Sequence, residues 1–213
     1  MFTAIRKMIG MHISQNHNTY FVLLIAFVLG VSAGAFTVIG LSSIQRDELL
    51  NYFQGFLQLL DSQKVDSNEL LSIVLLENAK IIAILWVLGV SIIGIPFIFL
   101  LISVKGFVTG FSTGFIINAI GFKGVLFAVF ALLPKEIIIV PCLIALGVNG
   151  INFSLKIIKK RSAKNALKDS LKSDFFSYCF VTLFFSCFVF LGVLLEAYIT
   201  PVFIRIVAPV ITA

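Results

Sequence analysis

The chain has 213 residues, of which 60% are apolar and only 12% are charged, and its mean hydropathy is +1.11. Soluble domains usually carry about 25% charged residues, so this composition excludes a soluble domain. A transmembrane helix needs about 20 apolar residues, and the length leaves room for roughly five or six spans without a sizeable soluble catalytic domain. The three cysteines lie inside apolar runs and lack metal-ligand spacing, which indicates neither a disulfide framework nor a metal site.

Long apolar runs predict an all-α membrane bundle that forms one domain over residues 1–213. The predicted transmembrane helices cover residues 20–41, 80–104, 106–122, 124–155 and 175–196. The segments outside them are residues 1–19, 42–79, 156–174 and 197–213. The alternating ten-residue pattern of a membrane β-barrel does not occur.

The Lys and Arg residues beside the spans predict the orientation. Residues 1–19 carry Arg6 and Lys7 and no acid, and residues 156–174 carry seven basic residues against two acids. The loop over residues 42–79 instead carries six acids against two basic residues. Because short cytoplasmic segments are enriched in Lys and Arg, we expect a cytoplasmic N-terminus, an external loop at 42–79 and an external C-terminus.

Small residues recur every four positions on the first and third predicted spans, and this spacing places them on one helix face. They are Ala26, Gly30 and Gly34 in the first span, and Gly106, Gly110 and Gly114 in the third. Helices associate in lipid through close contact at such faces, so we predict helix-packing surfaces. They can serve one chain or join copies in a homo-oligomer.

Residues 110–114 (GFSTG) match the G-x-S-x-G pattern of serine hydrolases. That nucleophile needs a preceding strand and a histidine base, whereas here the pattern lies inside an apolar helix and the two histidines, His12 and His17, lie before the first span. We therefore predict no catalytic residue, no cofactor and no metal. The chain also lacks a nucleotide-binding motif, and we expect no nucleic-acid partner.

Pro134, Lys135 and Glu136 interrupt the fourth apolar run and form a candidate functional kink. One interpretation is a short helix dipping in from outside, followed by the crossing helix, with both charges at the outer interface. Glu136 would then pair with Lys135 or Lys123. The other is a broken helix at the membrane midplane, where the charges bind a substrate or partner. A 32-residue helix would be about 48 Å long, which exceeds the hydrocarbon thickness and favours the first interpretation.

Apolar residues in the external loop follow helical spacing and predict an amphipathic helix on the outer surface. They are Leu49, Phe53, Phe56, Leu57 and Leu60. Asp66 and Glu69 then fit a capping box for a second helix that runs into the next span. The amphipathic helix can rest on lipid or offer a docking face.

Seven stretches together resemble the stage II sporulation protein M family of spore-forming bacteria. They are residues 12–20 (HISQNHNTY), 28–35 (VLGVSAGA), 85–89 (LWVLG), 94–96 (GIP), 105–111 (KGFVTGF), 133–137 (LPKEI) and 195–201 (LEAYITP). The broader family tends to carry His-Gly after the proline that matches Pro134, where this chain has Lys135 and Glu136.

The resemblance implies a non-enzymatic scaffold for engulfment, in which the mother-cell membrane migrates around the forespore. Its partners would be peptidoglycan hydrolases resembling stage II sporulation proteins P and D, held at the septal membrane. We expect them to dock on the acidic outer loop, through Asp47, Glu48, Phe53, Phe56, Leu57, Asp61 and Asp66. A remoter similarity to ABC-type permeases implies an alternative, a permease subunit for a lipid or small molecule, which would need a polar cavity between the spans.

Overall fold

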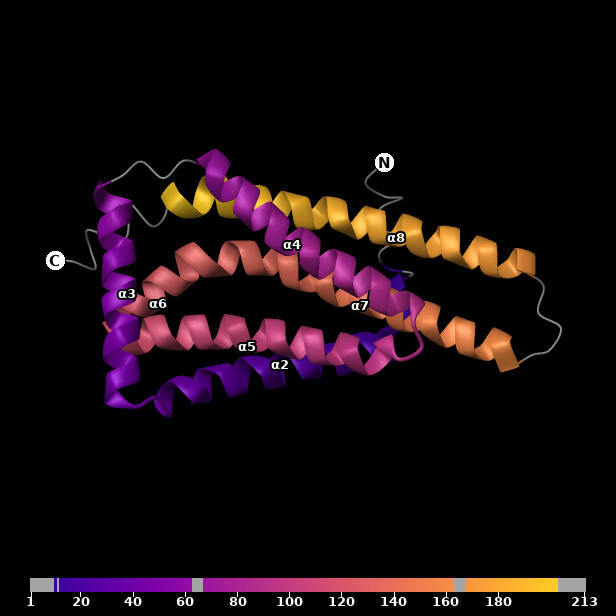
Figure 1. The fold of residues 1–213 in the computed structure, drawn as a ribbon, viewed down its shortest axis with the longest axis horizontal. Coiled ribbons are helices and arrows are strands. Elements are labelled where there is room, and N and C mark those ends of the chain that lie inside the picture. Colours follow the sequence, from indigo (N-terminus) through magenta and orange to yellow (C-terminus); the bar gives the residue numbers. More distant parts are fainter. Residues whose placement is uncertain (1–9, 11, 63–66, 163–167, 203–213) are drawn as a thin grey trace.

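The computed structural model describes residues 10, 12–62, 67–162 and 168–202, and all regular elements within these ranges are helices. Five are long and apolar enough to cross a membrane, which confirms the predicted all-α membrane class. These candidate spans are His17–Ile39, Asn68–Val90, Gly94–Ile120, Leu133–Lys160 and Leu171–Val202. Figure 1 shows them as an elongated bundle.

Helices α2 (His17–Ile39) and α5 (Gly94–Ile120) lie side by side along the bundle and form its most extensive helix pair (Figure 1). Leu23 of α2 is fully buried in the main core, together with Ile98 and Ile102 of α5.

The turn between α4 (Ser67–Val90) and α5 lies at residues 91–93, which corrects the predicted span boundaries. We placed the break at Lys105, between spans 80–104 and 106–122, because a charge interrupts the apolar run there. The structure instead starts α5 at Gly94, with Pro96 in its first turn, where a helix needs no backbone N–H. A Cβ at Gly94 would lie 1.8 Å from the Leu88 carbonyl oxygen, so this reversal requires glycine.

Residues 122–162 form one helical run made of α6 (Phe122–Phe127), a π-helical turn η1 (Ala128–Leu132) and α7 (Leu133–Ser162). Gly121 precedes it with φ of +60°, a conformation that favours glycine. Within an apolar stretch of 18 residues, 67% of the residues are buried in the α7 span. The corresponding stretches of the other four spans are only 22–28% buried. Because α7 also contacts α2, α4, α5 and α8, it is the central helix of the bundle.

Helix α8 (Lys168–Leu194) packs along α7 and continues into a second π-helical turn, η2 (Leu195–Ile199). Asn149 of α7 joins the two helices by donating from Nδ2 to the Tyr178 carbonyl oxygen at 3.1 Å and to the Thr182 hydroxyl at 3.2 Å. The Phe153 and Tyr178 rings stack with centroids 4.5 Å apart.

Helix α3 (Ser43–Ser62) crosses the end of the bundle where α2 and α5 finish (Figure 1). Its Leu49, Leu50 and Phe53 pack against a small core that contains Phe115 and Phe127. The predicted helix that runs into the second span is present as α4, with Glu69 in its first turn. Asp66 of the expected capping box lies outside the described residues.

Candidate functional site

A charged cavity of about 190 Å³ lies between α4, α5, α7 and η2. Five ionisable side chains line it, namely Glu77, Lys105, Lys135, Glu136 and Glu196. Asn78, Thr109, Ser112 and Thr113 add amide and hydroxyl groups. Glu77 and Lys105 lie near the middle of α4 and α5, so the cavity lies midway along the bundle and not at its end.

Two ion pairs join the helices around this cavity, which we call the charged cavity from here on. The Lys105 ammonium lies 3.5 Å from Glu136 Oε1, and these side chains are 22% and 12% exposed. Lys135 pairs with Glu196, and both side chains are 18% exposed. Breaking a buried pair by removing one partner typically costs about 3–5 kcal/mol, because it leaves an uncompensated charge. The two pairs therefore fix α5 to α7 and α7 to η2.

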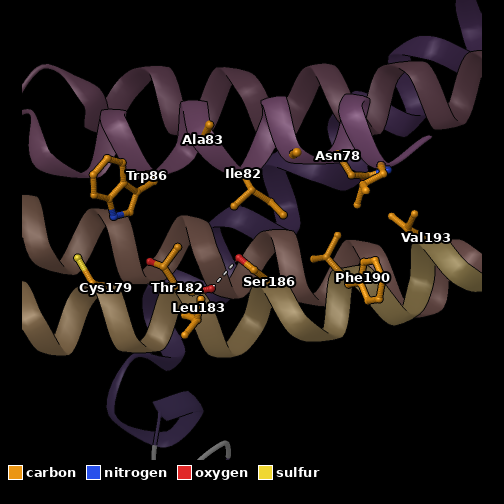
Figure 2. A pocket seen from close by; sticks show the side chains of 13 residues that line it. Asn78, Ile82, Ala83, Trp86, Cys179, Thr182, Leu183, Ser186, Phe190 and Val193 are labelled. Carbon is orange, nitrogen blue, oxygen red and sulfur yellow. Dashed lines mark hydrogen bonds between the residues drawn. The ribbon is translucent and has the colours of Figure 1, made fainter. Parts of the chain in front are cut away.

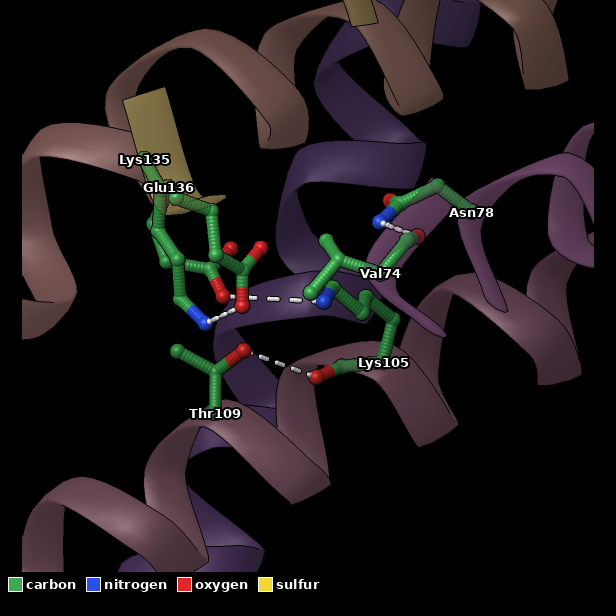
Figure 3. Close-up of polar contacts among 7 residues, drawn as sticks. Val74, Asn78, Lys105, Thr109, Lys135 and Glu136 are labelled. Carbon is green, nitrogen blue, oxygen red and sulfur yellow. Dashed lines mark hydrogen bonds and ion pairs between the residues drawn. The ribbon is translucent and has the colours of Figure 1, made fainter. Parts of the chain in front are cut away.

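Two residues of the charged cavity carry a buried oxygen atom that has no hydrogen-bond partner among the described residues: Asn78 Oδ1 and Glu136 Oε2. Asn78 is 6% exposed, and its Nδ2 donates to the Val74 carbonyl oxygen at 2.9 Å. Turning the amide over would place Oδ1 against that carbonyl oxygen, so the hydrogen bond fixes which amide atom lacks a partner. Figure 3 shows these groups and the ion pair between Lys105 and Glu136.

Charged residues that line the charged cavity lie in or just after the two π-helical turns. The η1 turn ends at Leu132, two residues before Pro134, which has no backbone N–H and cannot continue the ordinary hydrogen-bond ladder. Lys135 and Glu136 follow it, and Glu196 belongs to η2. Insertion of a π-helical turn changes the direction in which the next side chains point, and such turns are frequent at functional sites.

Lys135 and Glu136 thus lie elsewhere than our favoured interpretation placed them. They line the interior cavity with residues from mid α4 and mid α5, and Glu136 pairs with Lys105 instead of a near neighbour in sequence. The run from Phe122 to Ser162 does begin with a separate short helix, and α7 supplies the crossing, as the length of the run led us to expect. Only the position of the two charges differs. Sequence reasoning also missed Glu77 and Glu196. Their signal was a single acid beside or within a long apolar run.

The predicted small-residue stripes of α2 and α5 face each other. A Cβ at Gly30 or Gly34 would lie 2.1 Å from the carbonyl oxygen of Ser103 or Phe107, respectively. A Cβ at Gly106 would lie 2.3 Å from the Phe27 carbonyl oxygen, and one at Gly110 would lie 2.1 Å from that of Val31.

The remaining two stripe residues fit more loosely. A Cβ at Gly114 would lie 3.2 Å from the Cα of Ala35, and Ala26 is partly buried. The close approach of the stripes occurs within one chain.

The candidate docking residues on α3 divide into two groups. Asp47 and Glu48 are exposed, whereas Phe53 packs edge-on against Phe115 and Phe127, with ring centroids 6.2 and 6.1 Å apart. The side chains of Phe56, Leu57, Asp61 and Asp66 lie outside the described part of the structure. The apolar face of α3 therefore packs on the bundle as far as Phe53, and the described acids face away from that contact.

Two further hollows lie along the bundle. A groove of about 540 Å³ between α4 and α8 is mainly apolar (Figure 2). The hydroxyls of Thr182 and Ser186 within it donate to backbone carbonyl oxygens one turn earlier. A polar hollow of about 360 Å³ near the start of α2 includes His12, whose pKa is lowered by burial. His12 Nδ1 lies 3.0 Å from the Tyr20 hydroxyl.

These features define a multi-pass α-helical membrane protein with a charged interior cavity and a helix fixed across one end of its bundle. The family comparison agrees with that class: residues 23–201 match the family described as stage II sporulation protein M, and the chain belongs to this family. The family is one of sporulation membrane proteins that are generally non-catalytic. A search of curated proteins and a search of solved structures found no similar protein.

Proposed function

We propose that the protein is a non-enzymatic scaffold in the mother-cell septal membrane that holds peptidoglycan hydrolases during engulfment. The proposed partners resemble stage II sporulation proteins P and D. Family membership supports a role in sporulation, and the observation that carries the docking proposal is the placement of α3. Its apolar face packs on the bundle end through Phe53, while Asp47 and Glu48 remain exposed.

The distribution of charge supports an external position for α3. Lys156, Lys159 and Lys160 lie near the end of α7, and α3 lies at the opposite end of the bundle (Figure 1). Basic residues favour the cytoplasmic side, so this arrangement favours α3 on the outer side, where wall hydrolases act. A helix packed against the bundle would then hold a docked enzyme at a fixed height above the membrane.

The test is capture of the purified hydrolase by the full chain in detergent. Replacing Asp47 with Asn and Glu48 with Gln should reduce recovery at low salt and have less effect at high salt, because exposed charges are screened over about 8 Å at physiological ionic strength. Glu69→Gln, an exposed acid at the start of α4, is the matched control. Wild-type recovery by the double variant at low salt would refute docking through these acids and direct attention to residues 200–213.

The charged cavity supports a second candidate function, that of a permease subunit. Small-molecule sites usually have volumes of about 300–1,000 Å³, and this cavity has about 190 Å³, which is too small for a lipid. Purification in mild detergent separates the two functions. Recovery of a wall hydrolase with the chain supports the scaffold, and recovery of a separate ATPase supports the permease.

A further inference from the structure

The polar hollow of about 360 Å³ near the start of α2 is formed by three segments of the chain. Its polar residues from α7 share one face of that helix, because they follow one another at intervals of three or four residues. They are Asn149, Asn152, Lys156 and Lys159. Helix α8 adds Asp174 and Ser177, and the segment before α2 adds Gln15. The volume is within the range of about 300–1,000 Å³ that is usual for small-molecule sites.

Positive charge exceeds negative charge around the polar hollow. Asp174 is the only carboxylate among its described lining residues, and both oxygens of Asp174 are paired. Its Oδ1 lies 3.2 Å from the Lys156 ammonium, and its Oδ2 pairs with Lys160. Lys159 is exposed and forms no ion pair or hydrogen bond within the described ranges. Three lysines against one carboxylate leave a surplus of positive charge that faces outward, where an anion can reach it.

The polar hollow also contains side-chain donors that no protein group uses. Asn152, Ser177 and Gln15 line it from three different segments, and none of these side chains forms a hydrogen bond within the described structure. By contrast, the Asn149 amide donates to the Tyr178 carbonyl oxygen and to the Thr182 hydroxyl. Ammonium, amide and hydroxyl groups are the side-chain donors that bind phosphate oxygens in proteins. The free donors and the surplus charge therefore fit a phosphate group.

The position of the polar hollow along the bundle favours a lipid as the source of that phosphate. Lys159 lies next to the end of the candidate span Leu133–Lys160, and Asp174 lies near the start of the span Leu171–Val202. The headgroups of a bilayer lie where spans end, so the hollow is at the depth of lipid phosphates. Val181 lines the hollow one turn further into α8 and adds apolar surface on the side of the hydrocarbon.

We propose that the polar hollow binds the headgroup phosphate of an anionic phospholipid through Asn152, Lys156 and Lys159. Basic pockets between transmembrane helices are known to bind the headgroups of anionic lipids. A phosphate in this hollow accepts hydrogen bonds from α7, from α8 and from the segment before α2. The bound lipid therefore stabilises the packing of these three segments.

This lipid site does not depend on hydrolase docking. The proposed docking acids lie on α3, which crosses the opposite end of the bundle from the lysines of α7 (Figure 1). It does not depend on the orientation of the chain either, because both surfaces of a bilayer carry headgroups. The two proposals can therefore fail separately.

The test uses the full chain in an uncharged mild detergent at fixed pH and ionic strength, titrated with phosphatidylglycerol or with zwitterionic phosphatidylcholine. Thermal unfolding is followed by the fluorescence of Trp86, the only tryptophan. Phosphatidylglycerol at ten times its dissociation constant should raise the midpoint by roughly 3–5 °C. Glycerol phosphate, which has no acyl chains, distinguishes a lipid from a free phosphate. Equal rises with the two lipids, or an equal rise with glycerol phosphate, would overturn the proposal.

Two lysine variants separate a built site from general attraction to a basic surface. Lys159→Gln should weaken phosphatidylglycerol binding at least about fivefold, whereas Lys172→Gln should change it by less than about twofold. Lys172 is an exposed lysine of α8 that is not among the residues lining the hollow, so both variants remove the same charge near the same end of the bundle. Equal weakening by the two variants would refute the site.

A third variant tests the hydrogen-bond donors without changing the charge. Asn152→Ala removes an amide that has no partner within the described structure, so folding should persist while phosphatidylglycerol binding weakens at least about fivefold. Unfolding midpoints without lipid show whether each variant is folded. Wild-type affinity in both Lys159→Gln and Asn152→Ala would contradict the proposed contacts.

Discussion

Alanine at Gly110 tests the α2–α5 contact most directly. The new Cβ would lie 2.1 Å from the Val31 carbonyl oxygen, so the two backbones would have to separate by roughly 1 Å to reach ordinary contact. A gap of 0.5–1 Å removes about a quarter to a half of the dispersion energy of each affected atom pair. Overpacking of this kind typically costs about 1–3 kcal/mol.

The helix propensity of alanine opposes this cost, because alanine is favoured over glycine by about 1 kcal/mol inside a helix. Gly55→Ala isolates that gain, since a Cβ at Gly55 meets nothing within 4 Å. Gly114→Ala is intermediate, with the nearest atom at 3.2 Å. The gain in helix propensity is common to the three variants, so we expect the stability order Gly55→Ala, Gly114→Ala, Gly110→Ala, with about 1–3 kcal/mol between the first and last.

Unfolding in mixed detergent micelles, titrated with a denaturing detergent, measures this series. Gly110→Leu should prevent folding, whereas Val108→Leu should be tolerated because Val108 is 53% exposed. Equal stability of Gly110→Ala and Gly55→Ala would refute the packing argument, since it would mean that the two backbones do not touch.

Three other predictions concern charge and orientation. In a background without Cys142, Cys179 and Cys187, an impermeant thiol reagent applied to intact cells should label Gln63→Cys and leave Ala163→Cys unlabelled; the opposite pattern would reverse the proposed orientation. Glu136→Gln should lower the free energy of unfolding by about 3 kcal/mol, because it leaves Lys105 unpaired. The double variant Lys105→Met, Glu136→Leu should recover much of this stability, and a double variant less stable than the single one would contradict the ion-pair argument. Burial lowers the pKa of His12 below its ordinary value of 6.5, so the folded chain binds this proton more weakly than the unfolded chain does. The stability due to neutral His12 is therefore present above pH 6.5 and lost as pH falls below it, and His12→Gln should flatten the pH dependence of the thermal midpoint between pH 7.5 and 5.5.

The sequence was sufficient to predict features that depend on local periodicity. Apolar runs predicted five membrane helices, because crossing a bilayer imposes a minimum length on each helix, although the boundary between the second and third was misplaced. The four-residue spacing of Gly106, Gly110 and Gly114 placed them on one face by helix geometry alone, and α5 presents that face to α2. The amphipathic pattern of residues 49–60 likewise predicted a helix outside the spans, and α3 covers these residues.

Features that depend on distant pairing could not be predicted in the same way. The residues next to Lys105 in the sequence do not reveal whether this lysine ends a span or lies within one. The partner that allows it to lie within a span, Glu136, belongs to another helix. Lys135 and Glu196 are separated by 61 residues, and their pairing follows from how α7 and α8 pack. The turn at residues 91–93 had a local signal in Gly94 and Pro96, but counting charges gave Lys105 more weight.

The packing of α3 against α5 decides which variants can identify the docking surface. Ser112 lines the charged cavity, and Phe115, one turn later, packs on Phe53 of α3. Phe53→Ser would therefore disturb the end of α5 as well as α3, and a loss of hydrolase recovery in that variant would not identify the docking surface. The energies of neighbouring substitutions with shared partners do not add, whereas those of distant, independent sites usually do. Asp47 and Glu48 are exposed and lack that contact with α5, so their neutral variants should reduce docking without disturbing the packing of α3 on the bundle.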